Sequence, residues 1–297
     1  MVSPDPEGSS LDDSYHVELT EHVALRLGHI EGVVAVALGG SLARHEAYPD
    51  SDVDLGIYYR PDAPPSVKQI RRLAEELDDR HPQDAATHLG EWGPWINGGA
   101  WLRIGGQRVD WLYRDLDRVE EVFAECRAGR QSCYYQPGHP HGFHNHIYMG
   151  EVHFCRPLFD PENELVALKG QTAEYPFRLR SAIVEKYLWE AQFALDTGGK
   201  SADRDDVFYV GGCAFRCVAC LVQVLFALNG RYFVNEKGSV ETVETFSLKP
   251  PDFGEVVETV MGGTGRFSAD LKVSMERLGV LVAEVRALCF YSDLIGD

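Results

Sequence analysis

The stretch VVAVALGGSLAR at residues 33–44, followed by SDVDLGIYY at residues 51–59, decides the fold of this chain. Residues 33–38 are an unbroken apolar run rich in β-branched residues, which predicts a buried strand. The two glycines that follow allow a tight backbone turn, after which Ser41 is expected to begin a helix. Backbone N–H groups and a hydroxyl at such a position form a cradle for phosphate oxygens, so the turn predicts a phosphate site.

A pair of acids introduces the second strand. Residues 53–59 predict this strand, and side chains two positions apart on a strand share a face, so Asp52 and Asp54 are expected to point the same way. Two unpaired carboxylates side by side repel each other, which raises the pKa of one of them unless a hard divalent cation lies between them. Mg²⁺ that carries the phosphates of a nucleotide is the expected occupant.

A third acid is expected from a neighbouring strand. The alternating sequence RVDWLY at residues 108–113 supplies Asp110, far enough beyond Asp54 for the chain to cross the sheet through a helix and return. That helix has Ser66 as its N-cap, and its apolar stripe is Ile70, Leu73, Ala74 and Leu77. The alternative for Asp110 is an ion pair with Arg108 or Arg114.

These elements together resemble the polymerase-β-like nucleotidyltransferase superfamily, in its small-molecule-modifying, aminoglycoside-nucleotidyltransferase-like branch. The shared pattern is Gly40-Ser41, a spacer of some ten residues, the acids Asp52 and Asp54 in SDVDL, and Asp110 on a later strand. Arg44 fits the basic position that often follows the Gly-Ser turn. The specific resemblance covers residues 33–113, and beyond it only a helical second half of the right size remains.

The resemblance implies an α+β fold, in which an N-terminal nucleotidyltransferase domain with a mixed β-sheet flanked by helices precedes a C-terminal helical bundle. It places the catalytic domain at residues 14–155 and a domain that covers substrate and nucleotide at 156–297. Residues 1–13, rich in Pro, Ser, Gly and Asp, are expected to be a disordered tail.

The implied enzyme transfers a nucleoside monophosphate, with AMP from ATP as the expected case, to a hydroxyl of a small acceptor and releases pyrophosphate. An aminoglycoside-like acceptor would make it an antibiotic-resistance enzyme. The metal ligands for two Mg²⁺ ions would be Asp52, Asp54 and Asp110, and the nucleotide-binding residues would be Gly39, Gly40, Ser41, Arg44 and Lys186. Relatives differ in which residue is the general base, so both Asp110 and Glu151 are candidates.

Composition agrees with an enzyme of two domains, because the chain has 297 residues, of which 44% are hydrophobic and 25% charged. Its net charge of −18 repels polyanions, which argues against long DNA or RNA as a substrate and favours a cationic small molecule. We identify no apolar run of membrane-spanning length and no secretion signal, so a cytoplasmic location is expected. The oligomeric state is left open.

The second half predicts helices at residues 180–196, 213–229 and 270–289 from their apolar stripes. In this superfamily a lysine of the bundle often contacts the triphosphate, and Lys186, opposite the stripe of the first helix, is the candidate. The alternative is a surface ion pair between Lys186 and Glu190.

Two clusters could hold other metals. Cys213, Cys217 and Cys220 have the spacing of an iron–sulfur motif, but they lie in an apolar helical run, which favours small buried side chains. The segment between His139 and His153 contains Pro and Gly and predicts a loop that lines the cleft, with a transition-metal site or a merely polar surface as alternatives. Its histidines are His139, His141, His144, His146 and His153.

Three functions therefore remain open. The first is transfer to a small hydroxylated acceptor. The second is nucleotidyl transfer to a protein or a tRNA end, as in toxin–antitoxin relatives, which would require a basic or exposed apolar docking face. The third is a nucleotide-binding regulatory module that has lost catalysis, and the intact carboxylates argue against it.

Overall fold

The computed structural model describes residues 8–44 and 51–292, and side chains from residue 17 onward. Of the expected tail, residues 1–7 lie outside the described residues, and helix α1 (Gly8–Gly28) begins at Gly8. The chain divides into two compact units: unit 1 is Met1–Val122 with Tyr148–Ala173, and unit 2 is Phe123–Ile147 with Glu174–Asp297. Each unit is therefore built from two separate segments of the chain.

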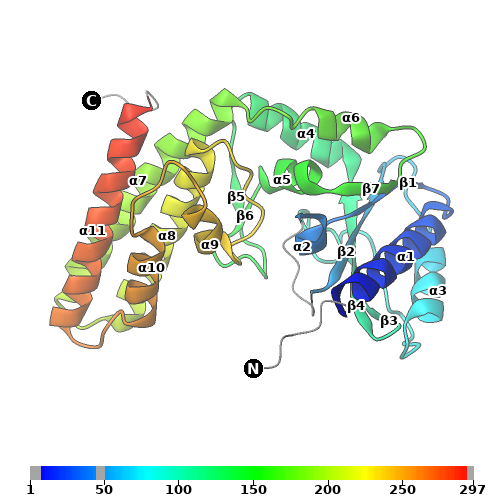
Figure 1. Cartoon of the computed structure of the whole chain (residues 1–297), viewed down its shortest axis with the longest axis horizontal. Coiled ribbons are helices and arrows are strands. Elements are labelled where there is room, and N and C mark those ends of the chain that lie inside the picture. Colours follow the sequence, from blue (N-terminus) through cyan, green and yellow to red (C-terminus); the bar gives the residue numbers. More distant parts are fainter. Residues whose placement is uncertain (1–7, 45–50, 293–297) are drawn as a thin grey trace. The chain divides into compact units, whose positions relative to one another are not determined.

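Unit 1 contains a mixed five-stranded sheet in the order β3-β4-β2-β1-β7 (Figure 1). The central strands β2 (Val53–Tyr59) and β4 (Gln107–Asp115) are parallel, and every other pair in the sheet is antiparallel. The remaining strands are β1 (Val33–Leu38), β3 (Gly99–Ile104) and β7 (Arg156–Phe159). The strands expected at residues 33–38, 53–59 and 108–113 are thus confirmed.

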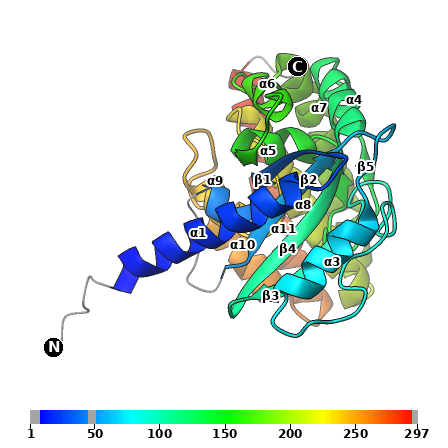
Figure 2. The ribbon, with the colours of Figure 1, turned by 90° about the vertical axis from the view of Figure 1, so that its right-hand side faces the viewer.

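The helices of unit 1 cover one face of this sheet. Helix α1 packs on β1 and β7, and α3 (Val67–Leu77) packs beside it and on β3 (Figure 2). Ser66 is the N-cap of α3 as predicted, because its hydroxyl accepts a hydrogen bond from the Gln69 N–H. The buried core beneath these helices takes alternate residues of the strands: Val36 and Leu38, Val53, Leu55 and Ile57, and Val109, Trp111 and Tyr113.

This alternation turns Asp54 and Asp110 to the opposite face of the sheet, because they lie between core residues of β2 and β4. The short helix α2 (Gly40–Arg44) contacts β2. Three further helices connect the strands or follow them: α4 (Leu116–Arg127), which crosses from unit 1 into unit 2, α5 (Ile147–Phe154) and α6 (Glu164–Gly170).

Unit 2 is built on three long helices that pack side by side, α7 (Phe177–Ala202), α8 (Val207–Leu228) and α11 (Ser268–Tyr291) (Figure 1). They are the helices expected from the apolar stripes, and each extends beyond its expected range. Two shorter helices, α9 (Ser239–Glu244) and α10 (Phe253–Gly262), and a hairpin of β5 (Cys133–Tyr134) with β6 (Phe143–His144) complete the unit. The α+β class is confirmed.

Helix α8 corrects one expectation. Its 22 residues, with a mean hydropathy of 1.9 in the most apolar window, are long and apolar enough to cross a membrane, although no such run was identified from the sequence. Within the structure 72% of that window is buried, which is also typical of the central helix of a folded bundle. Its length and composition are therefore weak grounds for a membrane span.

The core face of the sheet makes a direct prediction about stability. Ile57 is 0% exposed on the central strand β2, so Ile57→Ala should lower the free energy of unfolding by about 2–5 kcal/mol. Leu25→Ala on α1, where the side chain is 50% exposed, is the control and should change stability far less. Urea denaturation followed by circular dichroism measures both. Equal losses in the two variants would contradict the assigned core.

Candidate functional site

The turn after β1 is fixed against β2. The Gly39 N–H donates a hydrogen bond to the backbone oxygen of Asp54 over 2.8 Å. Gly40 has φ +62°, and a Cβ added there would overlap Oδ2 of Asp54. Only glycine therefore fits at this position, because both the backbone conformation and the space exclude a side chain. The turn and the Asp54 carboxylate are packed against each other.

Asp54 and Asp110 are brought together by strand pairing. They are direct partners in the parallel register of β2 and β4, and both side chains are half-buried. The register is set by the neighbouring core residues, since a slip of one position would turn Asp110 into the apolar face. The backbone register of the two strands therefore places these two acids side by side.

Asp52 is placed differently from expectation. It precedes the first residue of β2 and forms an ion pair with the Arg108 guanidinium, so the partner that we considered for Asp110 belongs to Asp52. Among the described residues, the three aspartates do not form a group whose carboxylate oxygens all lie within 4.8 Å of one another. Asp52 is nevertheless close enough for its negative charge to raise the pKa of Asp110.

The electrostatics of Asp110 are set by its burial and by the charged groups around it. Burial, followed by the negative charges of Asp54 and Asp52, raises the pKa of Asp110 to about 7, while Arg108 opposes the shift. A divalent cation between the carboxylates would remove this repulsion. Oxygen ligands are also the donors that Mg²⁺ prefers, so the residues present fit such an ion.

Glu151, the other candidate base, is already engaged. Its two carboxylate oxygens accept hydrogen bonds from Nε and Nη2 of Arg114, each over 2.8 Å. Arg114 is buried on β4, and its guanidinium also lies over the Tyr148 ring at 5.6 Å. Both oxygens of Glu151 are thus occupied by Arg114, and Arg114 is not the partner of Asp110 that the sequence left open.

The other expected nucleotide-binding residues lie in different units. Ser41 and Arg44 lie on α2 in unit 1 and are half-buried. Lys186 lies on α7 in unit 2, where its Nζ donates to Oε1 of Gln131 over 2.9 Å. The alternative pair of Lys186 with Glu190 is wrong, because Glu190 binds Arg216 at 2.5 Å instead.

The histidine segment, for which we expected a loop that lines the cleft, contains three buried imidazoles. His141, His144 and His146 are buried in unit 2, whereas His153 lies on α5 in unit 1. Burial lowers the pKa of His146 to about 4 and moves that of His144 lower still, so both imidazoles are neutral at physiological pH. The alternative of a merely polar surface is therefore wrong.

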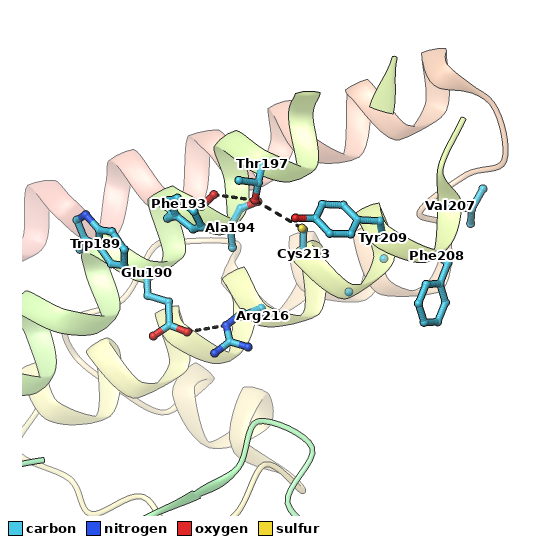
Figure 3. Close-up of a pocket in the computed structure, with 12 residues that line it drawn as sticks. Trp189, Glu190, Phe193, Ala194, Thr197, Val207, Phe208, Tyr209, Cys213 and Arg216 are labelled. Carbon is cyan, nitrogen blue, oxygen red and sulfur yellow. Dashed lines mark hydrogen bonds and ion pairs between the residues drawn. The ribbon is translucent and has the colours of Figure 1, made fainter. Parts of the chain in front are cut away.

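The cysteines of α8 separate into two environments. Cys217 and Cys220 are buried, as expected, whereas Cys213 is half-buried. Cys213 faces a pocket of about 900 Å³ in unit 2, which the sequence analysis missed. Exposed aromatic side chains on amphipathic helices were the available signal. Figure 3 shows the pocket, and the aromatic residues that line it are Trp189, Phe193, Phe208 and Tyr209.

Comparisons with known proteins bear on both parts of the chain. Residues 21–88, which contain Gly40, Asp52 and Asp54 but not Asp110, match the family described as "Nucleotidyltransferase domain". Residues 148–237 match a family described as "Domain of unknown function (DUF4037)". A comparison with curated proteins gave no match.

One solved structure is a distant likeness. It is a nucleotidyltransferase-like protein from Exiguobacterium sibiricum, with 11% identity, a TM-score of 0.44, and coverage of 95% of this chain and 79% of that one. These values are too low to support an argument. The family match to residues 21–88 is what shows a nucleotidyltransferase domain in this chain, and hence an enzyme of the nucleotidyltransferase class.

Gly40 offers the sharpest test of the site's geometry. Gly40→Ala adds a Cβ on Oδ2 of Asp54 and a backbone cost of roughly 1–2 kcal/mol at positive φ, so it should abolish the rise in melting temperature caused by Mg²⁺ with a non-hydrolysable nucleoside triphosphate. Gly39→Ala should cost less, because its Cβ would lie 3.8 Å from the Asp54 backbone oxygen. Equal losses would contradict the proposed contact with Asp54.

Proposed function

We propose that this enzyme transfers a nucleoside monophosphate from Mg²⁺-bound nucleoside triphosphate, with ATP as the expected donor, to a hydroxyl of a small cytoplasmic acceptor. The observation that supports this most is the pairing of Asp54 with Asp110 in register, beside a glycine turn that leaves no room for a side chain. A hard cation between facing carboxylates and a turn for phosphate are what nucleotidyl transfer requires.

In this proposal Asp52, Asp54 and Asp110 are the ligands of the divalent cations. The cations would neutralise charge on the leaving pyrophosphate and lower the pKa of the acceptor hydroxyl. Gly40, Ser41 and Arg44 bind the phosphates in this proposal, because backbone N–H groups, a hydroxyl and a guanidinium can donate to phosphate oxygens at the start of α2. Gly39, whose N–H donates to the Asp54 backbone oxygen, contributes by shaping the turn. The role of Lys186 on α7 as a further nucleotide contact stays a prediction.

Asp110 is the better general base of the two candidates. Glu151 is held by both nitrogens of the Arg114 fork, whereas Asp110 lies directly opposite Asp54 at the site itself. The Asp110 carboxylate takes the proton of the acceptor hydroxyl, the acceptor oxygen bonds to the α-phosphorus, and the bond to the pyrophosphate oxygen breaks.

We assign the acceptor to the aromatic pocket of unit 2. Its volume of about 900 Å³ lies within the usual range of small-molecule sites, about 300–1,000 Å³. Trp189 and Phe193 are stacked with ring centroids 5.3 Å apart, which gives a flat apolar wall for a ring-shaped acceptor. Glu190 and Arg216 on the same lining form an ion pair, so their charges balance and the aromatic rings dominate the wall.

A protein acceptor is the second candidate, because the same region carries exposed aromatic rings. Trp189 is 64% exposed and Phe208 is 92% exposed, and contiguous exposed apolar side chains often mark interaction sites. A modified protein would then replace the small molecule, while the chemistry at the carboxylates would be unchanged. A polyanionic tRNA is disfavoured by the net charge of −18.

The metal assignment predicts the effect of one conservative change. Asp54→Asn should lower the rate of pyrophosphate release on the order of a thousandfold or more, because it removes a charged cation ligand and several kcal/mol of transition-state stabilisation. It should also remove the Mg²⁺-dependent rise in melting temperature. Asp62→Asn, which changes an exposed acid beyond β2, is the matched control and should retain both properties. Full activity in Asp54→Asn would exclude the proposed site.

The two substrates should respond to different residues of α7. Trp189→Ala should raise the KM for the acceptor and leave the KM for the nucleotide unchanged. Lys186→Met should raise the KM for the nucleotide and leave the KM for the acceptor unchanged. Radiolabelled ATP is supplied with either a panel of hydroxylated amines or a protein lysate as the acceptor. The product that carries the label distinguishes a small-molecule acceptor from a protein acceptor. Unchanged kinetics in Trp189→Ala with every acceptor would show that this pocket has no part in the reaction.

A further inference from the structure

Three potential metal ligands converge inside unit 2, apart from the aspartates of unit 1. They are His141 in the β5–β6 connection, Glu190 on α7 and Cys220 on α8. Among the described residues, these three offer one ligand atom each, a ring nitrogen, a carboxylate oxygen and a sulfur, that all lie within 4.8 Å of one another. His141 and Cys220 are buried and Glu190 is half-buried, so the cluster is largely shielded from water.

The distance between the two soft donors suits one kind of ion. Nε2 of His141 and Sγ of Cys220 are 3.6 Å apart. With zinc–nitrogen and zinc–sulfur bonds of about 2.0–2.1 and 2.3 Å, tetrahedral geometry separates such a pair of ligand atoms by about 3.6 Å. The thiol proton now lies between them, and a cation that takes its place needs no change in this separation.

A chain of hydrogen bonds fixes which nitrogen of His141 is free to bind. Nδ1 of His141 lies 3.2 Å from Nε2 of His144, and Nδ1 of His144 lies 2.7 Å from the Tyr187 hydroxyl. That hydroxyl donates a hydrogen bond to Oε1 of Gln131. An amide oxygen can only accept hydrogen bonds, and this one also accepts a hydrogen bond from Nζ of Lys186. The Tyr187 hydroxyl therefore accepts from Nδ1 of His144, and Nε2 of His144 accepts from Nδ1 of His141. Nε2 of His141 is then left with a lone pair that faces Cys220.

This arrangement is that of an outer shell around a metal ligand, in which the second ring nitrogen of a histidine donates to a fixed acceptor. With Nδ1 of His141 turned toward His144, Nε2 is the nitrogen that faces Cys220 and can bind a cation.

Glu190 is oriented by Arg216, as Figure 3 shows. Nε of Arg216 donates to one carboxylate oxygen of Glu190 over 2.5 Å and leaves the other oxygen for a cation. A thiolate and a carboxylate together balance the charge of a divalent ion. The Cys220 thiol releases its proton to solvent when the sulfur–metal bond forms.

We propose that His141, Cys220 and Glu190 bind a zinc ion in unit 2, with a fourth position open to water. The combination of nitrogen, sulfur and oxygen donors selects a borderline-soft ion and disfavours Mg²⁺ or Ca²⁺. This ion is distinct from the cations of the nucleotidyl-transfer site. It would tie the β5–β6 connection to the two long helices α7 and α8.

The test uses full-length, tag-free protein stripped of metal with a chelator. We expect one equivalent of zinc to bind in competition with a chromophoric chelator, and Co²⁺ to give the near-ultraviolet band of thiolate-to-cobalt charge transfer. Cys220→Ser should abolish that band and lower zinc affinity by about 100-fold or more, since even outer-shell changes cost about 10–100-fold. Glu190→Gln should weaken binding but keep the band.

Cys213→Ser is the matched control, because it removes a half-buried thiol on the same helix α8 while leaving Cys220 in place. It should retain the band and the affinity. Circular dichroism checks the folding of each variant, and if Cys220→Ser fails to fold, the cobalt spectrum of Cys213→Ser and the affinity of Glu190→Gln decide. Loss of the band in Cys213→Ser, its absence from the unmodified protein, or unchanged zinc affinity in folded Cys220→Ser or Glu190→Gln would overturn the proposal.

Discussion

The parallel pairing of β2 with β4 is the constraint on which the candidate site of unit 1 depends. It sets Asp54 opposite Asp110, while the alternate residues on both strands enter the core beneath α1 and α3. The repulsion between the two half-buried acids is therefore held in place by apolar packing on the other face of the sheet. A fold can keep such a costly arrangement when its neighbours over-determine it, and sites with unbalanced charge are where function is expected.

Unit 2 buries several polar side chains among its apolar helices. His144, His146 and Gln223 are buried there, and a directed series of hydrogen bonds satisfies most of them. Such a network stabilises only when each member has a partner, because an unpaired buried polar group costs free energy. The series ends at Nε2 of His141, which lies against the Cys220 thiol. A zinc ion bound there would give this nitrogen a ligand bond in place of the contact with the thiol.

The sequence predicted the strands and helices that follow from local periodicity, but not the contacts that depend on residues far apart in the chain. Alternation located β2 and β4, but it was extended one residue too far, to Asp52, whose side chain pairs with Arg108. Likewise, Pro and Gly around the histidines indicated a loop, whereas contacts with Tyr187 and Gln223, far along the chain, bury the imidazoles. The roles of the site residues remain predictions, because they depend on ligands as well as on the fold.

The most direct test of the central claim is a crystal soaked with Mn²⁺ and a non-hydrolysable nucleoside triphosphate, measured at the manganese absorption edge. The account predicts an anomalous peak within about 2.0–2.3 Å of carboxylate oxygens of both Asp54 and Asp110, with the triphosphate against the Gly39–Gly40 turn and Asp52 released from Arg108. A bound triphosphate whose manganese lies away from both carboxylates would contradict it.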